Sequence, residues 1–203
     1  MSVSKTSLCN KALTLCGASP ITAITDDTNN ARALNRVYEI ALKAVLTECR
    51  WTFATTRATL TLSSTAGTLP WTHDGEAYVY VRPSTCLKIF EVSSPYAVWR
   101  EEGDTIISDT VDLGIKYVYY HDDPSKYPSY FLEALIDKLA SDISYMIINS
   151  VSKAEAFLAK YLKVSLPKAM ADNSQIGTQQ TLVDDAWEQA KLMNGGNPAR
   201  SYT

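Results

Sequence analysis

Acidic side chains that stand next to each other are the first candidates for chemistry in this sequence. Glu101 and Glu102 are adjacent, and so are Asp122 and Asp123. Two carboxyl groups held about 5–9 Å apart can cleave a glycosidic bond by acid and base catalysis. Neighbouring residues of a strand point to opposite faces, so Glu101 and Glu102 cannot line one cleft if they are extended. In a hairpin turn they are solvated, and we expect no catalytic role.

Histidine, the usual base that activates a nucleophile, occurs only at His73 and His121. Neither lies in a G-x-S-x-G frame, and we interpret both as surface or turn residues. The sequence also lacks a glycine-rich phosphate loop of the G-x-G-x-x-G or G-x-x-x-x-G-K type. We therefore predict that the chain is not an enzyme and binds no cofactor.

The four cysteines are Cys9, Cys16, Cys49 and Cys86. On a single helix, Cys9 and Cys16 have Cα atoms about 10 Å apart, too far for a disulfide. No C-x-x-C pair occurs and both histidines are distant in sequence, so a zinc site is not expected. We predict reduced, buried thiols that act as small hydrophobic side chains.

The composition is that of an ordinary globular chain, with 203 residues, 46% hydrophobic and 20% charged. The net charge of −3 argues against a strongly basic nucleic-acid-binding surface. The longest apolar run covers residues 77–81, far short of the roughly 20 residues that span a bilayer. The N-terminus lacks a secretory signal pattern, so we expect assembly in the cytoplasm.

Twelve tyrosines and four tryptophans are more aromatic side chains than a core of this size must hold. Tyrosine and tryptophan are enriched where proteins meet, which favours a binding surface. They also stiffen small sheets through cross-strand pairs. Both interpretations stay open.

Helical periodicity begins the chain. A first helix is predicted to end at Gly17, and a second runs from about Ala31 to Glu48, capped by Asp27 or Thr28. The apolar face of the second helix carries Leu34, Val37, Tyr38, Ala41 and Val45.

Helical periodicity returns in the second half. A third helix is predicted from near Pro128 to Asn149. Ser152 and Glu155 have capping-box spacing for a fourth helix, which Pro167 should kink or end. The apolar row of the third helix consists of Phe131, Leu135, Leu139 and Ile143.

Between the helices lies a block of alternating and β-branched residues. Gly103 indicates a hairpin turn between two of its strands. The predicted strands cover residues 57–62, 78–81, 87–92, 97–100, 105–108 and 115–120.

These elements predict an α+β fold. Residues 1–54 and 124–172 are expected to form a four-helix bundle, with an antiparallel β domain, residues 55–123, inserted between its halves. Residues 173–203 form a polar C-terminal arm with a short amphipathic piece. Such a segment is either disordered or orders against a partner, and we interpret it as a docking arm.

Several pieces of the chain, in this order and spacing, resemble the head-to-tail adaptor family of tailed bacteriophages. This family includes tail tubular protein A, the tail accessory factor of short-tailed phages and the head-completion connectors of long-tailed ones. The resemblance covers most of residues 5–192. It rests on the segments Asn10–Ile21, Cys49–Ala54, Arg82–Ile89, Trp99–Ile106, Tyr127–Leu135 and Trp187–Lys191.

The resemblance implies a structural virion protein at the head-tail interface. Members of the family form rings, commonly of twelve, between the dodecameric portal and the tail nozzle or tail tube. It further implies that the helices build the ring wall and that the arm docks on the portal. The expected portal-binding residues are Trp187, Leu192, Arg200 and Tyr202.

Double-stranded DNA is expected to pass through such a ring without specific binding. Twelve copies at −3 each carry about −36, and a wall that is not basic avoids Lys/Arg–phosphate contacts. Two alternatives remain: a virion-associated peptidoglycan-degrading enzyme, and a tail-tube or stopper subunit below the adaptor. We also predict that deletion of Asn173–Thr203 leaves the fold intact and abolishes portal docking.

Overall fold

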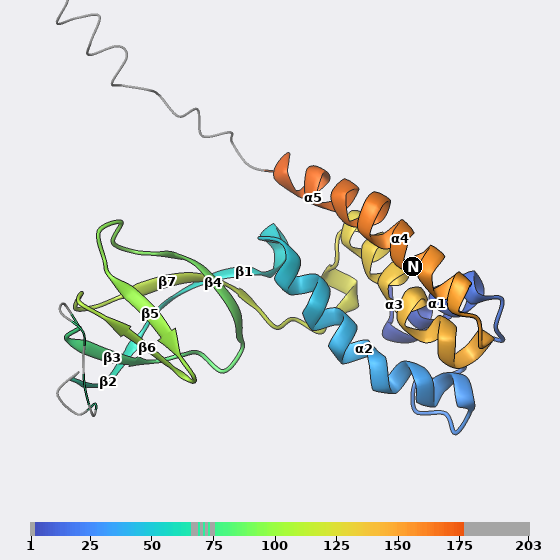
Figure 1. Cartoon of the computed structure of the whole chain (residues 1–203), viewed down its shortest axis with the longest axis horizontal. Coiled ribbons are helices and arrows are strands. Elements are labelled where there is room, and N and C mark those ends of the chain that lie inside the picture. The colour runs from blue at the N-terminus through green and yellow to red at the C-terminus, as the bar shows by residue number, and fades with distance from the viewer. Residues whose placement is uncertain (1–2, 66–68, 70, 72, 74–75, 177–203) are drawn as a thin grey trace, which may run out of the picture.

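The computed structural model describes residues 3–65, 69, 71, 73 and 76–176, and these form an α+β structure (Figure 1). Helices come from both ends of the described chain and strands from its middle. The helical elements are α1 (Lys5–Cys16), α2 (Asn29–Glu48), η1 (Thr52–Ala54), η3 (Pro124–Lys126), α3 (Ser129–Ile148), α4 (Val151–Lys160), η4 (Tyr161–Ser165) and α5 (Leu166–Ser174). The strands are β1 (Thr55–Thr59), β2 (Thr61–Thr65), β3 (Tyr78–Val81), β4 (Cys86–Val92), β5 (Trp99–Glu102), β6 (Thr105–Ser108) and β7 (Gly114–Tyr119).

The first two helices have the ends that the sequence predicts. Helix α1 stops at Gly17, whose left-handed φ of 71° is accessible to glycine without strain. The side chain of Thr28 caps α2 by accepting a hydrogen bond from the amide of Ala31 at 3.2 Å. Local chemistry therefore determines both boundaries.

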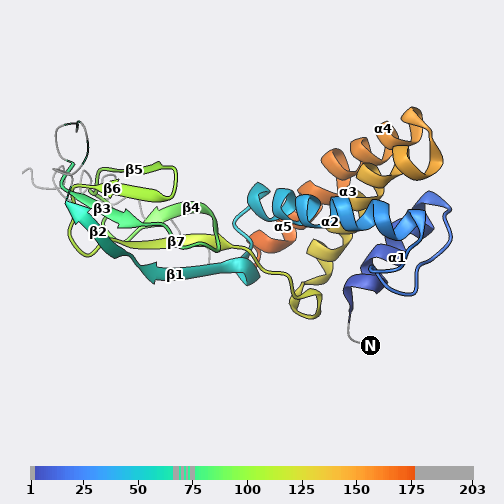
Figure 2. The same cartoon turned by 90° about the horizontal axis from the view of Figure 1, so that it is seen from below.

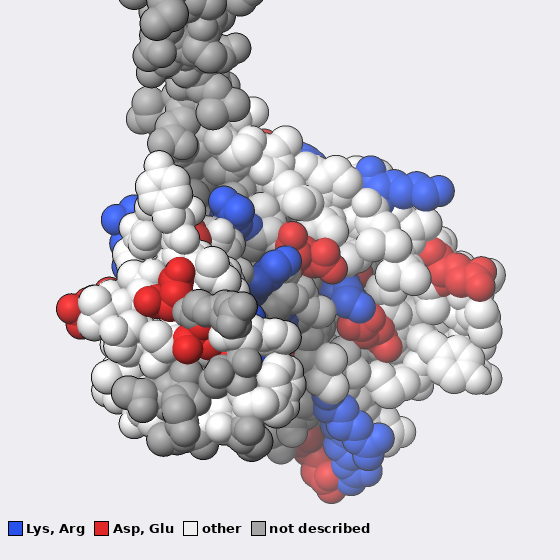
Figure 3. Space-filling view, turned by 60° about the vertical axis from the view of Figure 1, so that its left-hand side comes forward, with Lys and Arg blue, Asp and Glu red and all other residues white. Residues whose placement is uncertain are grey.

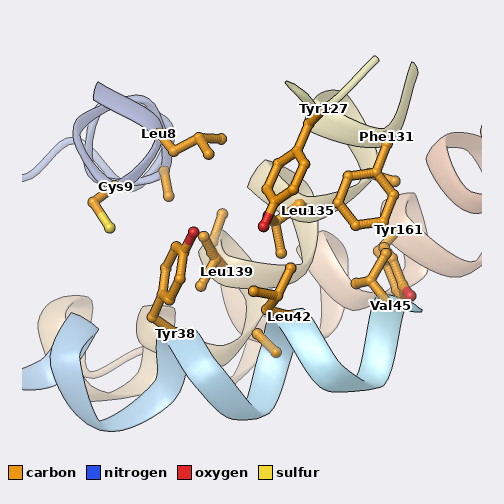
Figure 4. Close-up of a cluster of buried hydrophobic side chains, with 14 of the residues drawn as sticks. Leu8, Cys9, Tyr38, Leu42, Val45, Tyr127, Phe131, Leu135, Leu139 and Tyr161 are labelled. Atoms are coloured by element: carbon orange, nitrogen blue, oxygen red, sulfur yellow. The ribbon is translucent and has the colours of Figure 1, made fainter. Parts of the chain in front are cut away.

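Helix α3 lies at the centre of the helical part, and α1, α2, α4 and α5 each pack against it. Its predicted apolar row, Phe131, Leu135, Leu139 and Ile143, is completely buried. In Figure 4, Leu135 and Leu139 of α3 face Leu42 of α2. Burial of each such side chain stabilises the fold by about 1.5–3 kcal/mol.

The junction between α3 and α4 differs from the prediction. Asn149 adopts a left-handed conformation with φ of 53° and ends α3 with its amide bonded to the carbonyl of Tyr145. Helix α4 then begins directly at Val151 after Ser150. The predicted capping box of Ser152 and Glu155 is wrong, because the left-handed turn moves the helix start ahead of Ser152.

Pro167 does not end the last helix, which continues through it to Ser174. The segment before it, η4, is a π-helix in which the amide of Leu166 bonds to the carbonyl of Tyr161, five residues back. Proline cannot donate to the carbonyl four residues before it. The wider π turn adapts the backbone to this missing donor, so α4, η4 and α5 follow one another without a break.

The predicted strand over residues 57–62 is also wrong, since the chain changes sheets at Leu60. Strand β1 belongs to a three-stranded sheet of order β1-β7-β4, and β2 to a four-stranded sheet of order β2-β3-β6-β5. All neighbours in both sheets are antiparallel. The side chain of Leu60 is buried and its amide bonds to the carbonyl of Leu113 at 2.9 Å.

The two sheets share one hydrophobic cluster. Ile89, Ile115 and Tyr117 contribute to it from the three-stranded sheet, and Tyr80 and Ile106 from the four-stranded sheet. Gly103 turns the predicted β5–β6 hairpin with φ of 59°.

The strands lie on one side of the molecule and the helices on the other (Figure 2). Val118 of β7 belongs to the helical core, and Leu87 and Phe90 of β4 pack against that core. One end of the three-stranded sheet therefore contacts the helices directly, and the junction between the two parts is itself packed.

Candidate functional site

The paired glutamates are engaged by different arginines. In β5, Glu101 accepts a hydrogen bond from Nε of Arg82 at 2.8 Å, and Glu102 lies 2.8 Å from Nε of Arg100. Successive residues of this strand point to opposite faces, as the sequence predicts. The two carboxylates therefore do not converge on one substrate position.

The paired aspartates also separate. Asp122 lies 3.3 Å from Nζ of Lys5 and accepts a hydrogen bond from the hydroxyl of Tyr38 at 3.3 Å. Asp123 instead caps η3, and hydrogen bonding from the Ser125 hydroxyl lowers the pKa of Asp123 below its usual value. Asp122 therefore links the end of the β part to α1 and α2, whereas Asp123 acts locally as a helix cap.

His121, which the sequence indicates as a surface or turn residue, is half-buried and is part of an aromatic cluster. Its ring centroid lies 5.3 Å from that of Tyr119, 5.9 Å from Tyr127 and 6.5 Å from Phe53. Burial lowers the pKa of His121 below 6.5, so the neutral ring is favoured. His73 is exposed and packs edge-on against Trp71 at 4.9 Å.

Cys9, Cys16 and Cys86 are buried free thiols, and Cys49 is half-buried. Burial raises the pKa of Cys9 to about 11, which keeps this thiol protonated at neutral pH. Among the described residues, no group of three or more His, Cys, Asp or Glu side chains is arranged to hold a metal ion.

Helix α4 exposes an apolar stripe. None of its ten residues is buried, although its inner side packs against α3 through the half-buried Phe157. Val151 is 57% exposed, Leu158 40% and, in η4, Leu162 51%. Their spacing of seven and four residues places them on one side of the helix. We call Val151, Leu158 and Leu162 the α4 stripe.

The aromatic residues of the β part lie in two different settings. Tyr80 and Tyr117 are buried between the sheets. Tyr96 and Trp71 are 91% and 65% exposed, so these two side chains lie outside the core, and their exposure is compatible with a binding surface.

A groove of about 710 Å³ opens at the junction between the two parts of the molecule. The segment directly after α2 contributes Cys49 and Arg50, β4 contributes Lys88 and Phe90, and α5 contributes Met170. Two smaller hollows continue from Arg50 and Phe90 along the outer face of the three-stranded sheet to Gly114. The three hollows share lining residues, and we call them together the junction groove.

Asn173 fastens one wall of the junction groove. Its carboxamide oxygen accepts hydrogen bonds from the amide of Thr52 at 3.0 Å, the hydroxyl of Thr52 at 3.2 Å and the hydroxyl of Tyr130 at 3.3 Å. Its carboxamide nitrogen donates to the carbonyl of Arg50 at 2.9 Å. One side chain thus ties the end of α5 to the segment that leads from α2 into β1.

The charged lining of the junction groove is mainly positive. Its four basic side chains are Arg50, Arg57, Lys88 and Lys116, and its two acidic ones are Glu48 and Glu91. Arg50 and Lys116 both lie over the ring of Phe90, at 4.7 and 5.5 Å from its centroid. Figure 3 shows one face of the molecule, on which Lys and Arg residues are interspersed with Asp and Glu residues.

The predicted portal-binding residues, Trp187, Leu192, Arg200 and Tyr202, lie outside the described residues. Asn173, which the sequence assigns to the arm, belongs to the last turn of α5 and is 6% exposed. A deletion that begins at Asn173 therefore removes a core contact, so the predicted harmless deletion must begin after Ile176. The junction groove was missed because its residues are far apart in sequence.

Within the described residues, no helix has the length and apolar character needed to cross a membrane. Comparison with protein-family models and with curated proteins gave no match.

Proposed function

We propose that this chain is a structural subunit of a ring that joins the capsid of a tailed bacteriophage to its tail. The observation that carries the proposal is the α4 stripe. A helix with no buried residue of its own and with apolar side chains turned outward is suited to being covered by another subunit.

A second apolar site stands on another helix. Ile40 of α2 is 70% exposed, and α2 and α4 lie on different sides of α3 (Figure 1). When two different surfaces of a subunit meet, the contact is head-to-tail, and it builds a ring when the rotation from one subunit to the next closes. The α4 stripe of one copy against the Ile40 side of α2 in the next is such a contact.

In this proposal α1, α2, α3 and the α4–α5 helix act as the four-helix bundle of the ring wall. The inserted β domain faces the tail side or the exterior, and residues after Ile176 bind the portal. DNA passes through the channel without a specific contact. The competing hydrolase requires Glu101 and Glu102 to act together, whereas each is paired with a separate arginine.

Self-association is tested on the full chain by native mass measurement over a range of concentrations, with and without purified portal. Leu158→Glu combined with Leu162→Glu places two charges in the α4 stripe and is expected to leave only monomer. Ala156→Glu is the matched control, since it is exposed on another side of the same helix and should assemble like the wild type.

Two results would refute parts of this proposal. If the doubly charged variant assembles as the wild type does, the α4 stripe is not the interface. If the wild type stays monomeric at every concentration and on addition of portal, the ring itself is refuted. A chain truncated after Ile176 should still assemble but not co-sediment with portals.

A further inference from the structure

The junction groove combines positive charge with apolar surface. Four basic side chains line it against two acidic ones, and Lys116 already lies 3.3 Å from Glu91. The apolar surface comes from the half-buried Phe90 and from Met170, which is 37% exposed. A peptide with acidic and apolar side chains fits this lining better than the uniformly charged backbone of a nucleic acid.

The chain itself contains such a peptide. Residues 182–188 read Leu-Val-Asp-Asp-Ala-Trp-Glu, and so combine three carboxylates with Leu182, Val183 and Trp187. The described part of the chain ends at Ile176, and α5, which leads there, contributes Met170, Asn173 and Ser174 to the wall of the groove. The acidic peptide therefore follows the groove closely in the sequence.

We propose that residues 182–188 dock in the junction groove of their own chain. Leu182 comes six residues after Ile176, and six residues span up to about 20 Å, enough to return along the groove. A short linker gives an effective concentration in the millimolar range, so the chain's own peptide outcompetes that of a second copy in dilute solution.

In the docked state Asp184 and Asp185 lie near Arg50 and Lys88, and Trp187 packs on Phe90 and Met170. This inference goes beyond the ring and does not rest on it. It concerns where the peptide lies in the free subunit, before any partner competes for it.

Cys49 allows a direct test, because it lines the groove and is half-buried while the other three thiols are at most 7% exposed. Ala186→Cys in the full chain adds a second thiol inside the peptide. A short bismaleimide, applied to dilute protein, should join this thiol to Cys49 within one chain. The product keeps the mass of a monomer and, on digestion, yields a linked pair of peptides that contain positions 49 and 186.

Two variants serve as controls. Ala199→Cys places its thiol outside the peptide. If docking in the groove determines the yield, this variant should cross-link at least about tenfold less than Ala186→Cys; if only the tether to the chain mattered, the two yields would be equal. Adding Cys49→Ser to Ala186→Cys should remove the product. A covalent dimer as the main product, or equal yields at positions 186 and 199, overturns the proposal.

Charge reversal gives an independent readout. Arg50→Glu with Lys88→Glu should lower the Ala186→Cys yield about tenfold, and Asp184→Lys with Asp185→Lys should restore it in that background. If the reversed groove cross-links as well as the original one, electrostatic docking is refuted. If the wild-type groove gives no cross-link but binds labelled duplex DNA in a salt-dependent way, its ligand is nucleic acid and the peptide proposal fails.

Ring assembly, measured by mass, is read separately from this intramolecular product. Loss of the cross-link in a protein that still forms rings refutes only the docking of residues 182–188. Loss of rings with the cross-link intact refutes only the proposed function.

Discussion

Asn173→Ala should destabilise the whole chain although it removes a small polar side chain. The carboxamide of Asn173 is 6% exposed and satisfies the amide of Thr52 and the carbonyl of Arg50. It also accepts from the hydroxyls of Thr52 and Tyr130. Alanine can replace none of these contacts.

The size of this destabilisation depends on which of these polar groups can hydrogen-bond to water once the carboxamide is removed. Thr52 is exposed and Tyr130 is half-buried, so both hydroxyls can turn to water. The two main-chain groups cannot rotate, and each unsatisfied group costs about 1–3 kcal/mol. Because the adjacent groove admits some water, we expect a loss of about 2–4 kcal/mol in the free energy of unfolding. With a urea slope of about 2 kcal/mol per molar, the midpoint falls by about 1–2 M.

Urea unfolding followed by circular dichroism and tryptophan fluorescence measures this change. Ser174→Ala is the matched control on the next residue: its hydroxyl bonds only to Ala171 within the same exposed turn, so a change below about 0.5 kcal/mol is expected. Asn173→Asp keeps an acceptor for Thr52 but loses the donor to the carbonyl of Arg50. Its urea midpoint should therefore lie between those of Asn173→Ala and Ser174→Ala. Equal midpoints for Asn173→Ala and Ser174→Ala would refute the anchoring role.

Three further predictions concern single side chains. Tyr161→Phe should leave the free energy of unfolding unchanged or raise it by up to about 2 kcal/mol, since the buried Tyr161 hydroxyl has no hydrogen-bond partner among the described residues; thermal denaturation checks this. Asp137→Ala should lower the free energy of unfolding by about 1–3 kcal/mol, since the buried Ser165 hydroxyl loses its acceptor; urea midpoints measure this change. Folding lowers the pKa of His121, so as the pH falls the unfolded chain binds this proton at a higher pH than the folded chain does. The free energy of unfolding should therefore decrease as the pH drops below about 6.5, and His121→Phe should weaken that dependence.

The sequence predicts those boundaries where one residue type determines the backbone. Gly17 and Gly103 have positive φ angles, and Thr28 supplies a capping oxygen. Each acts within a few residues of itself, so neighbouring residues are enough to identify its role.

Boundaries that depend on distant packing could not be predicted. Alternation over residues 57–62 is compatible with one strand, and only the burial of Leu60 between the sheets moves β2 into the second sheet. Likewise, Pro167 would end an isolated helix, but the buried Ala169 and Asn173 hold α5 in place beyond it. The candidate surfaces depend on the same long-range packing, since Arg50, Lys88 and Met170 meet only in the folded chain.

The way α4 is attached leads to a prediction about the proposed ring. No side chain of α4 is buried, so α4 packs against α3 through half-buried side chains. It is also joined to α3 by the ion pair between Lys160 and the buried Asp137 at 2.8 Å. A segment with few buried apolar side chains opens locally at lower free energy than the core.

Backbone amides of α4 in the monomer should therefore exchange hydrogen faster than those of α2 and α3, and ring formation should slow them selectively. Hydrogen-exchange mass spectrometry compares the wild type with the doubly charged Leu158→Glu, Leu162→Glu chain, which is expected to stay monomeric. Two results would contradict the idea that a neighbouring subunit covers α4. In the first, the α4 amides are already as protected in the monomer as those of α3; in the second, their protection does not change on assembly.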